Sequence, residues 1–219
     1  PSFETISAFG SNGAIIHYNA KNVRKKTFLK KNNFYLLDSG SQYYFGTTDV
    51  TRTFVLGTVS SFHKNIYTYV LKGHIAVNNF NLTNKTRGHE VDKKARFFLK
   101  KYGKNYNHGT GHGIGYFLNV HENPPNISFN SKTKFFEAQI MSNEPGYYKE
   151  KHFGVRLENM MMVKKEKNKK YFESLTLVPF DKNGFNTKLL SKNEIKWINN
   201  YHKKVFKNLN KFLSLNEKN

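Results

Sequence analysis

Cysteine is absent from this chain of 219 residues, and its absence excludes two classes of protein. A small secreted scaffold held by disulfides needs cysteine pairs, and a structural zinc site with thiolate ligands needs cysteine as well. Long apolar runs are also missing, since no stretch approaches the roughly 20 residues of a membrane-spanning helix. Aromatic residues, in contrast, make up 16% of the chain. This composition argues against disorder and favours a folded domain with a substantial core.

Acidic residues and arginine are scarce, although the chain is strongly basic. The formal net charge is +21, from 36 Lys and Arg against 15 Asp and Glu. A basic surface can bind a polyanion through release of counterions. Only five of the basic residues are Arg, however, whereas specific phosphate and base contacts favour Arg. We therefore interpret the charge as lysine scattered over a solvated surface and do not expect a nucleic-acid partner.

The hydrophobic pattern predicts one domain of mixed helices and strands over residues 1–219, with no linker and no internal repeat. Ser191 and Glu194 have the spacing of a capping box, which predicts that a helix begins at this point. Apolar spacing predicts two earlier helices, at 60–78 and 90–102. Strands are predicted at 14–18, 34–38, 42–45, 49–56, 139–144, 154–163 and 175–179.

Four carboxylates occupy positions where neighbouring strands could bring them together. Asp38 follows an apolar run and Asp49 precedes one, on either side of a glycine-cornered turn. Taken alone, Asp at a strand end is more often a turn former than a ligand. Glu144 ends a short strand, and Glu158 lies within an otherwise apolar one. A carboxylate that faces a core is costly unless it is paired or bound to metal, so Glu158 is the strongest single candidate.

Histidine completes the candidate set. His108 and His112 lie in the segment His-Gly-Thr-Gly-His-Gly-Ile-Gly, and His121 follows shortly after it. A flexible surface loop is the alternative interpretation, whereas a phosphate-binding loop is disfavoured because no Lys-Ser/Thr pair follows. Two Asp, two Glu and one His together form the oxygen-rich ligand set expected of a dinuclear Mn, Co or Zn site.

Longer stretches around these residues resemble aminopeptidase P, the X-prolyl aminopeptidases of peptidase family M24, in their eukaryotic cytosolic form. The resemblance implies the α+β pita-bread fold, in which a curved, mostly antiparallel sheet is flanked by helices. It also implies a metal-dependent aminopeptidase that releases the N-terminal residue of a peptide when proline follows it. The stretches that carry it are 2–7, 13–18, 40–53, 108–122, 142–148 and 154–159, with weaker support at 177–179 and 197–202.

This resemblance implies two divalent ions, with Mn²⁺ as the first expectation and Co²⁺ or Zn²⁺ as alternatives. Asp49 and Glu158 would bridge the ions, and a hydroxide shared between the ions would attack the peptide carbonyl. Glu144 would in addition take a proton from the attacking water. The implied ligands are Asp38, Asp49, His112, Glu144 and Glu158.

The resemblance also implies residues that act on the substrate or orient the metal ligands. His17, His108 and His121 would position the substrate and stabilise or protonate the tetrahedral intermediate. Arg156 and Tyr148 would hydrogen-bond the ligand Asp38 and orient it.

The same residues distinguish aminopeptidase P from prolidases, from methionine aminopeptidases and from non-catalytic proteins of the same fold. Glu144 and Glu158 are fourteen positions apart, which fits aminopeptidase P better than prolidases, where the last two carboxylates are more widely spaced. Methionine aminopeptidases lack the glycine-rich histidine segment. A non-catalytic pita-bread module that binds nucleic acid or protein would suit the charge, but such modules typically lose metal ligands, and all five are present here.

The resemblance carries expectations about the surroundings of the domain. Two further domains and the first helices of the catalytic domain would precede residue 1, so we expect this chain to be a part of a longer polypeptide. A homodimer is expected, with peptides that begin Xaa-Pro as substrates and no membrane partner. The expected location is the cytoplasm, and a lysosome-like digestive vacuole is the alternative.

Overall fold

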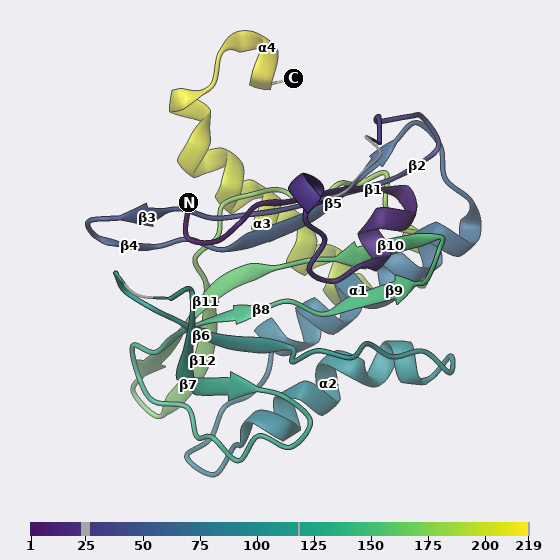
Figure 1. Ribbon diagram of the computed structural model, residues 1–219. Helices are drawn as coiled ribbons and strands as arrows, with labels where there is room; N and C mark the ends of the chain where they lie inside the picture. Colours follow the sequence, from purple (N-terminus) through teal and green to yellow (C-terminus); the bar gives the residue numbers. More distant parts are fainter. Residues whose placement is uncertain (23–26, 118, 219) are drawn as a thin grey trace.

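The computed structural model describes residues 1–22, 27–117 and 119–218 of the chain (Figure 1). The described helices are α1 (Ser61–Asn78), α2 (Gly88–Lys100), α3 (Lys192–Leu209) and α4 (Leu215–Lys218), with short 3₁₀ turns that include η1 (Gly10–Ala14). The strands are β1 (Ile6–Phe9), β2 (Asn33–Ser39), β3 (Gln42–Tyr43), β4 (Gly46–Thr47), β5 (Val50–Leu56), β6 (Gly111–Ile114), β7 (His121–Ile127), β8 (Ile140–Asn143), β9 (Gly146–Lys149), β10 (Phe153–Arg156), β11 (Asn159–Glu166) and β12 (Lys169–Ser174).

A three-stranded antiparallel sheet in the order β1-β2-β5 carries the first candidate carboxylates. Burial alternates along β2, so that Phe34, Leu36 and Asp38 share its buried face. Successive side chains of a strand point to opposite faces, and this period places the Asp38 carboxylate inward with the two apolar residues. Asp49 immediately precedes β5, and Asp38 lies opposite Thr51 in the register of the two strands.

A five-stranded antiparallel sheet in the order β12-β11-β8-β6-β7 carries the remaining candidates. Figure 1 shows β6 and β8 running side by side in the middle of the molecule. His112 lies on β6, and Glu144 directly follows β8. The order of the strands therefore brings a histidine and a carboxylate from distant parts of the chain to neighbouring positions.

Two clusters of buried apolar side chains hold the sheets and helices together. In Figure 1, α1 and α2 lie side by side beneath the strands, while α3 extends away towards the C-terminus. One cluster joins α2 to the five-stranded sheet, with Val91 and Met161 among its members. The other joins α1, α3 and β10, with Leu71, Val155 and Ile198 among its members. The α+β class predicted from the sequence is confirmed.

The predicted helices and the strand at 34–38 agree with the structure, as does the capping box, in which the Ser191 side chain accepts from the Glu194 N–H. Three other strand predictions are wrong. Residues 14–18 end a 3₁₀ helix and a turn, because Gly13 packs directly on Gly154 and the chain must curl there. Residues 175–179 have no strand partner, and β12 ends before them at Ser174.

The third wrong prediction concerns a single strand over 154–163. The structure has two strands there, β10 and β11, and Leu157–Glu158 forms an unpaired junction between them. The two strands also belong to different sheets, since β10 pairs with β9 and β11 pairs with β8 and β12. No helix in the described part of the chain is long and apolar enough to cross a membrane.

Candidate metal centre

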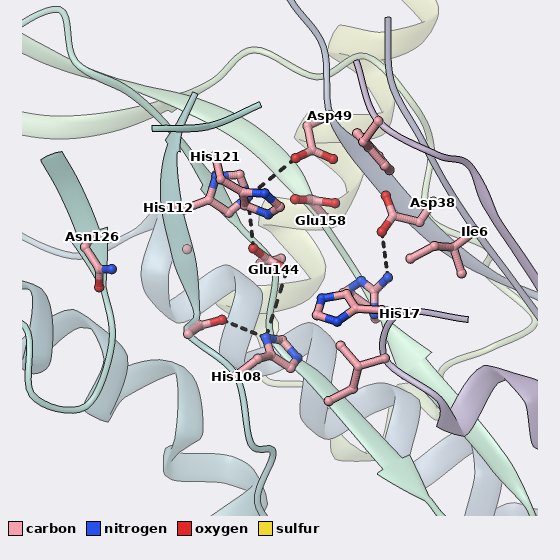
Figure 2. Close-up of a pocket in the computed structure, with 15 residues that line it drawn as sticks. Ile6, His17, Asp38, Asp49, His108, His112, His121, Asn126, Glu144 and Glu158 are labelled. Carbon is pink, nitrogen blue, oxygen red and sulfur yellow. Dashed lines mark hydrogen bonds and ion pairs between the residues drawn. The ribbon is translucent and has the colours of Figure 1, made fainter. Parts of the chain in front are cut away.

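The candidate residues meet in one cavity of about 250 Å³. Figure 2 shows the carboxylates and imidazoles pointing into it from both sheets and from the segment that follows η1. Apolar residues Phe3, Ile6 and Ile16 form part of the wall beside His17. The residues of the predicted set that line the cavity are His17, Asp38, Asp49, His108, His112, His121, Glu144, Arg156 and Glu158.

Three of the predicted ligands form a tight cluster. Asp49, His112 and Glu158 each present a ligand atom within 4.8 Å of the others. The Nε2 atom of His112 lies 3.5 Å from Asp49 Oδ2 and 3.3 Å from Glu144 Oε1. Glu144 therefore adjoins the cluster. Asp38 lies on the opposite side of Glu158, as Figure 2 shows.

The tautomer of His112 follows from its contacts. Its Nδ1 atom lies 2.8 Å from the carbonyl oxygen of Gly113, which can only accept, so Nδ1 carries the proton. Nε2 then presents its lone pair to the carboxylates. A neutral imidazole with this orientation is the form that binds a metal ion.

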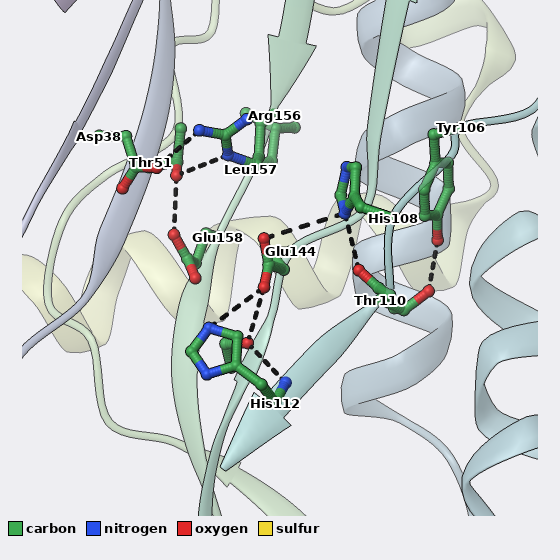
Figure 3. Close-up of polar contacts among 12 residues, drawn as sticks. Asp38, Thr51, Tyr106, His108, Thr110, His112, Glu144, Arg156, Leu157 and Glu158 are labelled. Carbon is green, nitrogen blue, oxygen red and sulfur yellow. Dashed lines mark hydrogen bonds and ion pairs between the residues drawn. The ribbon is translucent and has the colours of Figure 1, made fainter. Parts of the chain in front are cut away.

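A chain of hydrogen bonds runs from Asp38 through Arg156 and Tyr148 to His108, and Figure 3 shows its first contact, between Arg156 and Asp38. Arg156 donates from Nη2 to Asp38 Oδ2 at 2.6 Å and from Nη1 to the Tyr148 hydroxyl at 2.8 Å. Tyr148 in turn lies 2.9 Å from His108 Nε2, and His108 Nδ1 lies 2.7 Å from the Gly109 carbonyl oxygen. Arg156 therefore contacts Asp38 directly, whereas Tyr148 acts on Asp38 only through Arg156.

His108 is held neutral in this arrangement. Burial, and then the charge of Arg156, lower the pKa of His108 to about 3. Both of its ring nitrogens are already engaged by Tyr148 and Gly109. Its neighbours therefore fix the ring beside Glu144, whose Oε2 atom lies 4.0 Å from Nδ1.

Glu158 is only 2% exposed, and β5 supplies its main support. Thr51 donates its hydroxyl to Glu158 Oε2 at 2.7 Å, and the Glu158 N–H donates to the Thr51 carbonyl at 3.0 Å. Arg156 also donates from Nε to the Thr51 hydroxyl at 3.1 Å. Thr51 therefore joins the Glu158 carboxylate to the Asp38–Arg156 pair.

Electrostatics in the cavity favour added positive charge. Burial raises the pKa of Asp38, although the guanidinium of Arg156 partly offsets this effect. Burial likewise raises the pKa of Glu144 to about 7. The pKa of Glu158 is raised well above its usual value by burial and by its carboxylate neighbours. Crowded carboxylates resist ionisation together, and divalent cations would remove this repulsion.

The donor set fits divalent metal ions on these grounds. Within the described residues, Asp38 Oδ1 is buried and has no hydrogen-bond partner, so one oxygen of this carboxylate remains available as a ligand. Four carboxylates and one neutral imidazole are hard or borderline donors of the kind that Mn²⁺, Co²⁺ and Zn²⁺ accept.

Two histidines lie at the more exposed part of the cavity. His17 and His121 are both exposed. The ring centroid of His121 lies 4.2 Å from that of His112. Burial, and then the proximity of His112, lower the pKa of His121. These two rings are therefore accessible to a bound peptide, and they are more exposed than the ring of His108, which also lines the cavity.

Sequence reasoning missed two polar residues that support the ligands. Thr51 and Ser142 both lie within stretches that carry the family resemblance, but the sequence alone predicted no role for either residue. The Ser142 hydroxyl lies 3.1 Å from Glu144 Oε1 and accepts from the His112 N–H at 3.0 Å. A signal existed for Thr51, because Asp49, Thr51 and Thr53 alternate along one face of a strand.

Comparison with known proteins supports the same interpretation. The model of metallopeptidase family M24 matches residues 1–165, and the model of the C-terminal region of this peptidase family matches residues 170–219. A probable Xaa-Pro aminopeptidase P of Arthroderma gypseum is 43% identical over 99% of this chain and 36% of its own length. Xaa-Pro aminopeptidase 1 of Dictyostelium discoideum is 42% identical over 93% of this chain and 34% of its own length. The chain thus spans about a third of the curated relatives it matches.

Solved structures agree with the sequence relatives. The crystal structure of X-prolyl aminopeptidase from Caenorhabditis elegans, described as a cytosolic enzyme with a di-nuclear active site, superposes with a TM-score of 0.90 at 37% identity, over 96% of this chain and 35% of the other. Prolidase from Pyrococcus furiosus superposes with a TM-score of 0.71 at 30% identity, over 80% of this chain and 49% of the other. The predicted pita-bread fold is confirmed, and the chain belongs to metallopeptidase family M24.

Proposed function

We propose that this chain provides the catalytic centre of a metal-dependent aminopeptidase that releases the N-terminal residue of peptides with proline in the second position. The observation that carries the proposal is the meeting of Asp49, His112 and Glu158 within 4.8 Å, with Glu144 and Asp38 beside them. The similarity to Xaa-Pro aminopeptidases supports the choice of substrate.

In this proposal Asp38, Asp49, His112, Glu144 and Glu158 would hold two divalent ions. When bound, such ions polarise a peptide carbonyl and lower the pKa of water so that it becomes a nucleophile at neutral pH. We favour Mn²⁺, because the donor set is rich in carboxylate oxygens and contains a single imidazole.

The protein groups then have separate tasks. Glu144, which lines the cavity beside His112, accepts a proton from the attacking water. Arg156 holds Asp38 in one orientation. His17 and His121, at the exposed part of the cavity, contact the peptide and stabilise the charge that develops on its carbonyl oxygen.

The apolar wall of Phe3, Ile6 and Ile16 suits an uncharged part of the substrate. Proline lacks an amide N–H, so recognition of an Xaa-Pro bond must come from shape and apolar contact rather than from that donor. We further propose that the chain acts as the catalytic domain of a longer, dimeric polypeptide in the cytosol.

The test is hydrolysis of Arg-Pro-Pro in the presence of Mn²⁺, with Arg-Ala-Ala as the matched control peptide. We expect release of arginine from the proline peptide alone, and loss of that activity in Glu158→Gln. A protein that carries metal at both positions yet cleaves neither peptide would favour a non-catalytic binding module instead. Cleavage of both peptides at equal rates would remove the proline specificity from the proposal.

A further inference from the structure

The Leu157–Glu158 junction holds a proposed metal ligand outside any strand. Because neither residue belongs to β10 or β11, their backbone groups lack the partners that a sheet would provide. The Leu157 N–H donates to Pro145 O and the Glu158 N–H to Thr51 O. The two carbonyl oxygens accept from side chains instead: His74 Nδ1 lies 3.1 Å from Leu157 O, and Arg52 Nη1 donates to Glu158 O.

Arg52, which donates to Glu158 O, has an unusual set of partners for a buried cation. It is only 2% exposed, yet every hydrogen bond it makes in the described structure goes to a neutral oxygen and none goes to a carboxylate. A buried cation without an ionic partner is costly, and so a stabilising role alone accounts poorly for it. Its acceptors connect β5 and the junction with Val178, Pro179 and Tyr201 of the C-terminal region.

His74 caps the other carbonyl from α1. Its side chain is fully buried, and burial together with the nearby charge of Arg52 lowers its pKa to about 3. Since Leu157 O can only accept, Nδ1 of the neutral ring carries the proton. The backbone carbonyl of His74 accepts from Asn143 Nδ2 at 3.0 Å, and Asn143 directly precedes Glu144. One residue of α1 therefore touches the chain next to two of the proposed ligands.

Phe180 supports both of these side chains. The guanidinium carbon of Arg52 lies 4.2 Å from the centroid of the Phe180 ring, and the His74 ring lies 5.2 Å from it in an edge-on arrangement. Phe180 is 2% exposed and packs against Tyr201 of α3 at 5.1 Å. It belongs to residues 170–219, which match the C-terminal region of the family.

We infer that Arg52 and His74 are positioning residues for Glu158, and that the C-terminal region sets the geometry of the metal centre by bracing both of them with Phe180. The inference rests on the proposed metal-binding role of Glu158. It gives residues 170–219 a part in metal binding, although none of them lines the cavity. A shift of the C-terminal region would therefore alter the metal centre without contact between the two.

Phe180→Leu tests the inference, and Phe172→Leu provides a matched control. Phe172 is 3% exposed, lies in the same C-terminal region and contacts Phe135 instead of Arg52 or His74. We expect Phe180→Leu to weaken Mn²⁺ binding by about 10-fold or more, as loss of groups that orient ligands commonly does. The readouts are Mn²⁺ affinity and stoichiometry from calorimetry in the complete polypeptide, and urea unfolding of the metal-free protein.

Three further variants separate a positioning role from a purely structural one. His74→Asn keeps a donor near the place of Nδ1, whereas His74→Leu removes it. We expect the Asn variant to retain Mn²⁺ affinity within a few-fold of the wild type and the Leu variant to lose it as Phe180→Leu does. Arg52→Lys keeps the charge but not the fork of donors, and it should weaken Mn²⁺ binding in the same way.

The outcomes are distinct. Mn²⁺ binding that is weakened in Phe180→Leu but not in Phe172→Leu, with unfolding free energies of the metal-free variants lowered equally in the two, supports the inference. Equal Mn²⁺ affinity in both phenylalanine variants overturns it while leaving the proposed function intact. A wild-type protein that binds no divalent ion overturns the proposed function and this inference together.

Discussion

At the scale of the residue, Glu144 makes the stability of the metal-free protein depend on pH. In the folded, metal-free protein its pKa lies at about 7 instead of 4.5, mainly because of burial. Between these values the folded state keeps a proton that the unfolded chain has lost, so the contribution of Glu144 to stability is full at low pH and is lost as the pH rises through 7. Relative to Glu144→Gln, we expect the metal-free wild type to lose on the order of 3 kcal/mol of unfolding free energy from about pH 4.5 to about pH 8.

Urea unfolding after chelation of metal measures this difference. The comparison with Glu144→Gln removes the contributions of titratable groups that do not interact with Glu144. A difference between the two proteins that stays constant across the pH range would show that folding does not shift the pKa of Glu144.

Arg156 offers a second prediction at the scale of the residue. It donates to Asp38, Thr51 and Tyr148 through three different nitrogens. Lysine keeps the charge but cannot reach three acceptors in one plane. We expect Arg156→Lys to lower kcat and Mn²⁺ affinity by about 10- to 100-fold. Tyr148→Phe is the milder control, because it leaves the bonds of Arg156 to Asp38 and Thr51 in place and removes only the contacts of the Tyr148 hydroxyl with Arg156 and His108. Steady-state kinetics at saturating Mn²⁺ would contradict the prediction if Arg156→Lys and the wild type gave equal kcat.

At the scale of elements, the contact between η1 and β10 brings His17 to the cavity. A Cβ atom on Gly154 would lie 1.7 Å from the Gly13 carbonyl oxygen, which no side chain can tolerate without backbone movement. We expect Gly154→Ala to cost about 1–3 kcal/mol of stability and to raise KM, because the segment that leads to His17 is pushed away. Thermal stability and KM equal to those of the wild type would contradict the expectation.

At the scale of the whole molecule, bound metal would connect the two sheets. The proposed ligands come from the three-stranded sheet, from the five-stranded sheet and from the junction between β10 and β11. Binding to the folded state alone stabilises a protein by about 2.7 kcal/mol at a free ion concentration of 100 times Kd. We expect chelation of metal to lower Tm by several degrees, and Asp49→Asn to abolish the difference between the metal-loaded and metal-free proteins. An unchanged Tm on chelation would contradict the prediction.

This stabilisation by metal has a pH dependence of its own. Burial by itself would lower the pKa of His112 in the metal-free protein. Contact with Asp49 and the charge of Glu144 outweigh burial and raise this pKa. A proton on His112 competes with a metal ion, and the raised pKa lets this proton bind at a higher pH than in an ordinary histidine. We therefore expect Mn²⁺ affinity and peptidase activity to fall together as the pH drops, beginning above the ordinary histidine pKa of about 6.5. A pH–activity profile would also separate a neutral cytosolic enzyme from one suited to an acidic compartment.

Much of this protein is readable in its sequence, because the relevant signals are local. The apolar run before Asp38 and the apolar residues around Glu158 marked both carboxylates as candidates, and the spacing of Ser191 and Glu194 marked the start of α3. The identity of the ligands and their chemical type are properties of single residues in short patterns. The scarcity of arginine likewise limited what the positive charge could mean.

Only the tertiary structure decided where the strands around Glu158 end and which distant residues lie against it. The break at Leu157–Glu158 separates two strands that the apolar pattern had joined, because their partners belong to different sheets. Thr51, His74 and Phe180 are far apart in the chain and looked like ordinary strand, helix and loop residues until packing placed them around Glu158. Proximity depends on contacts between distant segments, and the free energy of those contacts becomes available only when the whole chain is folded.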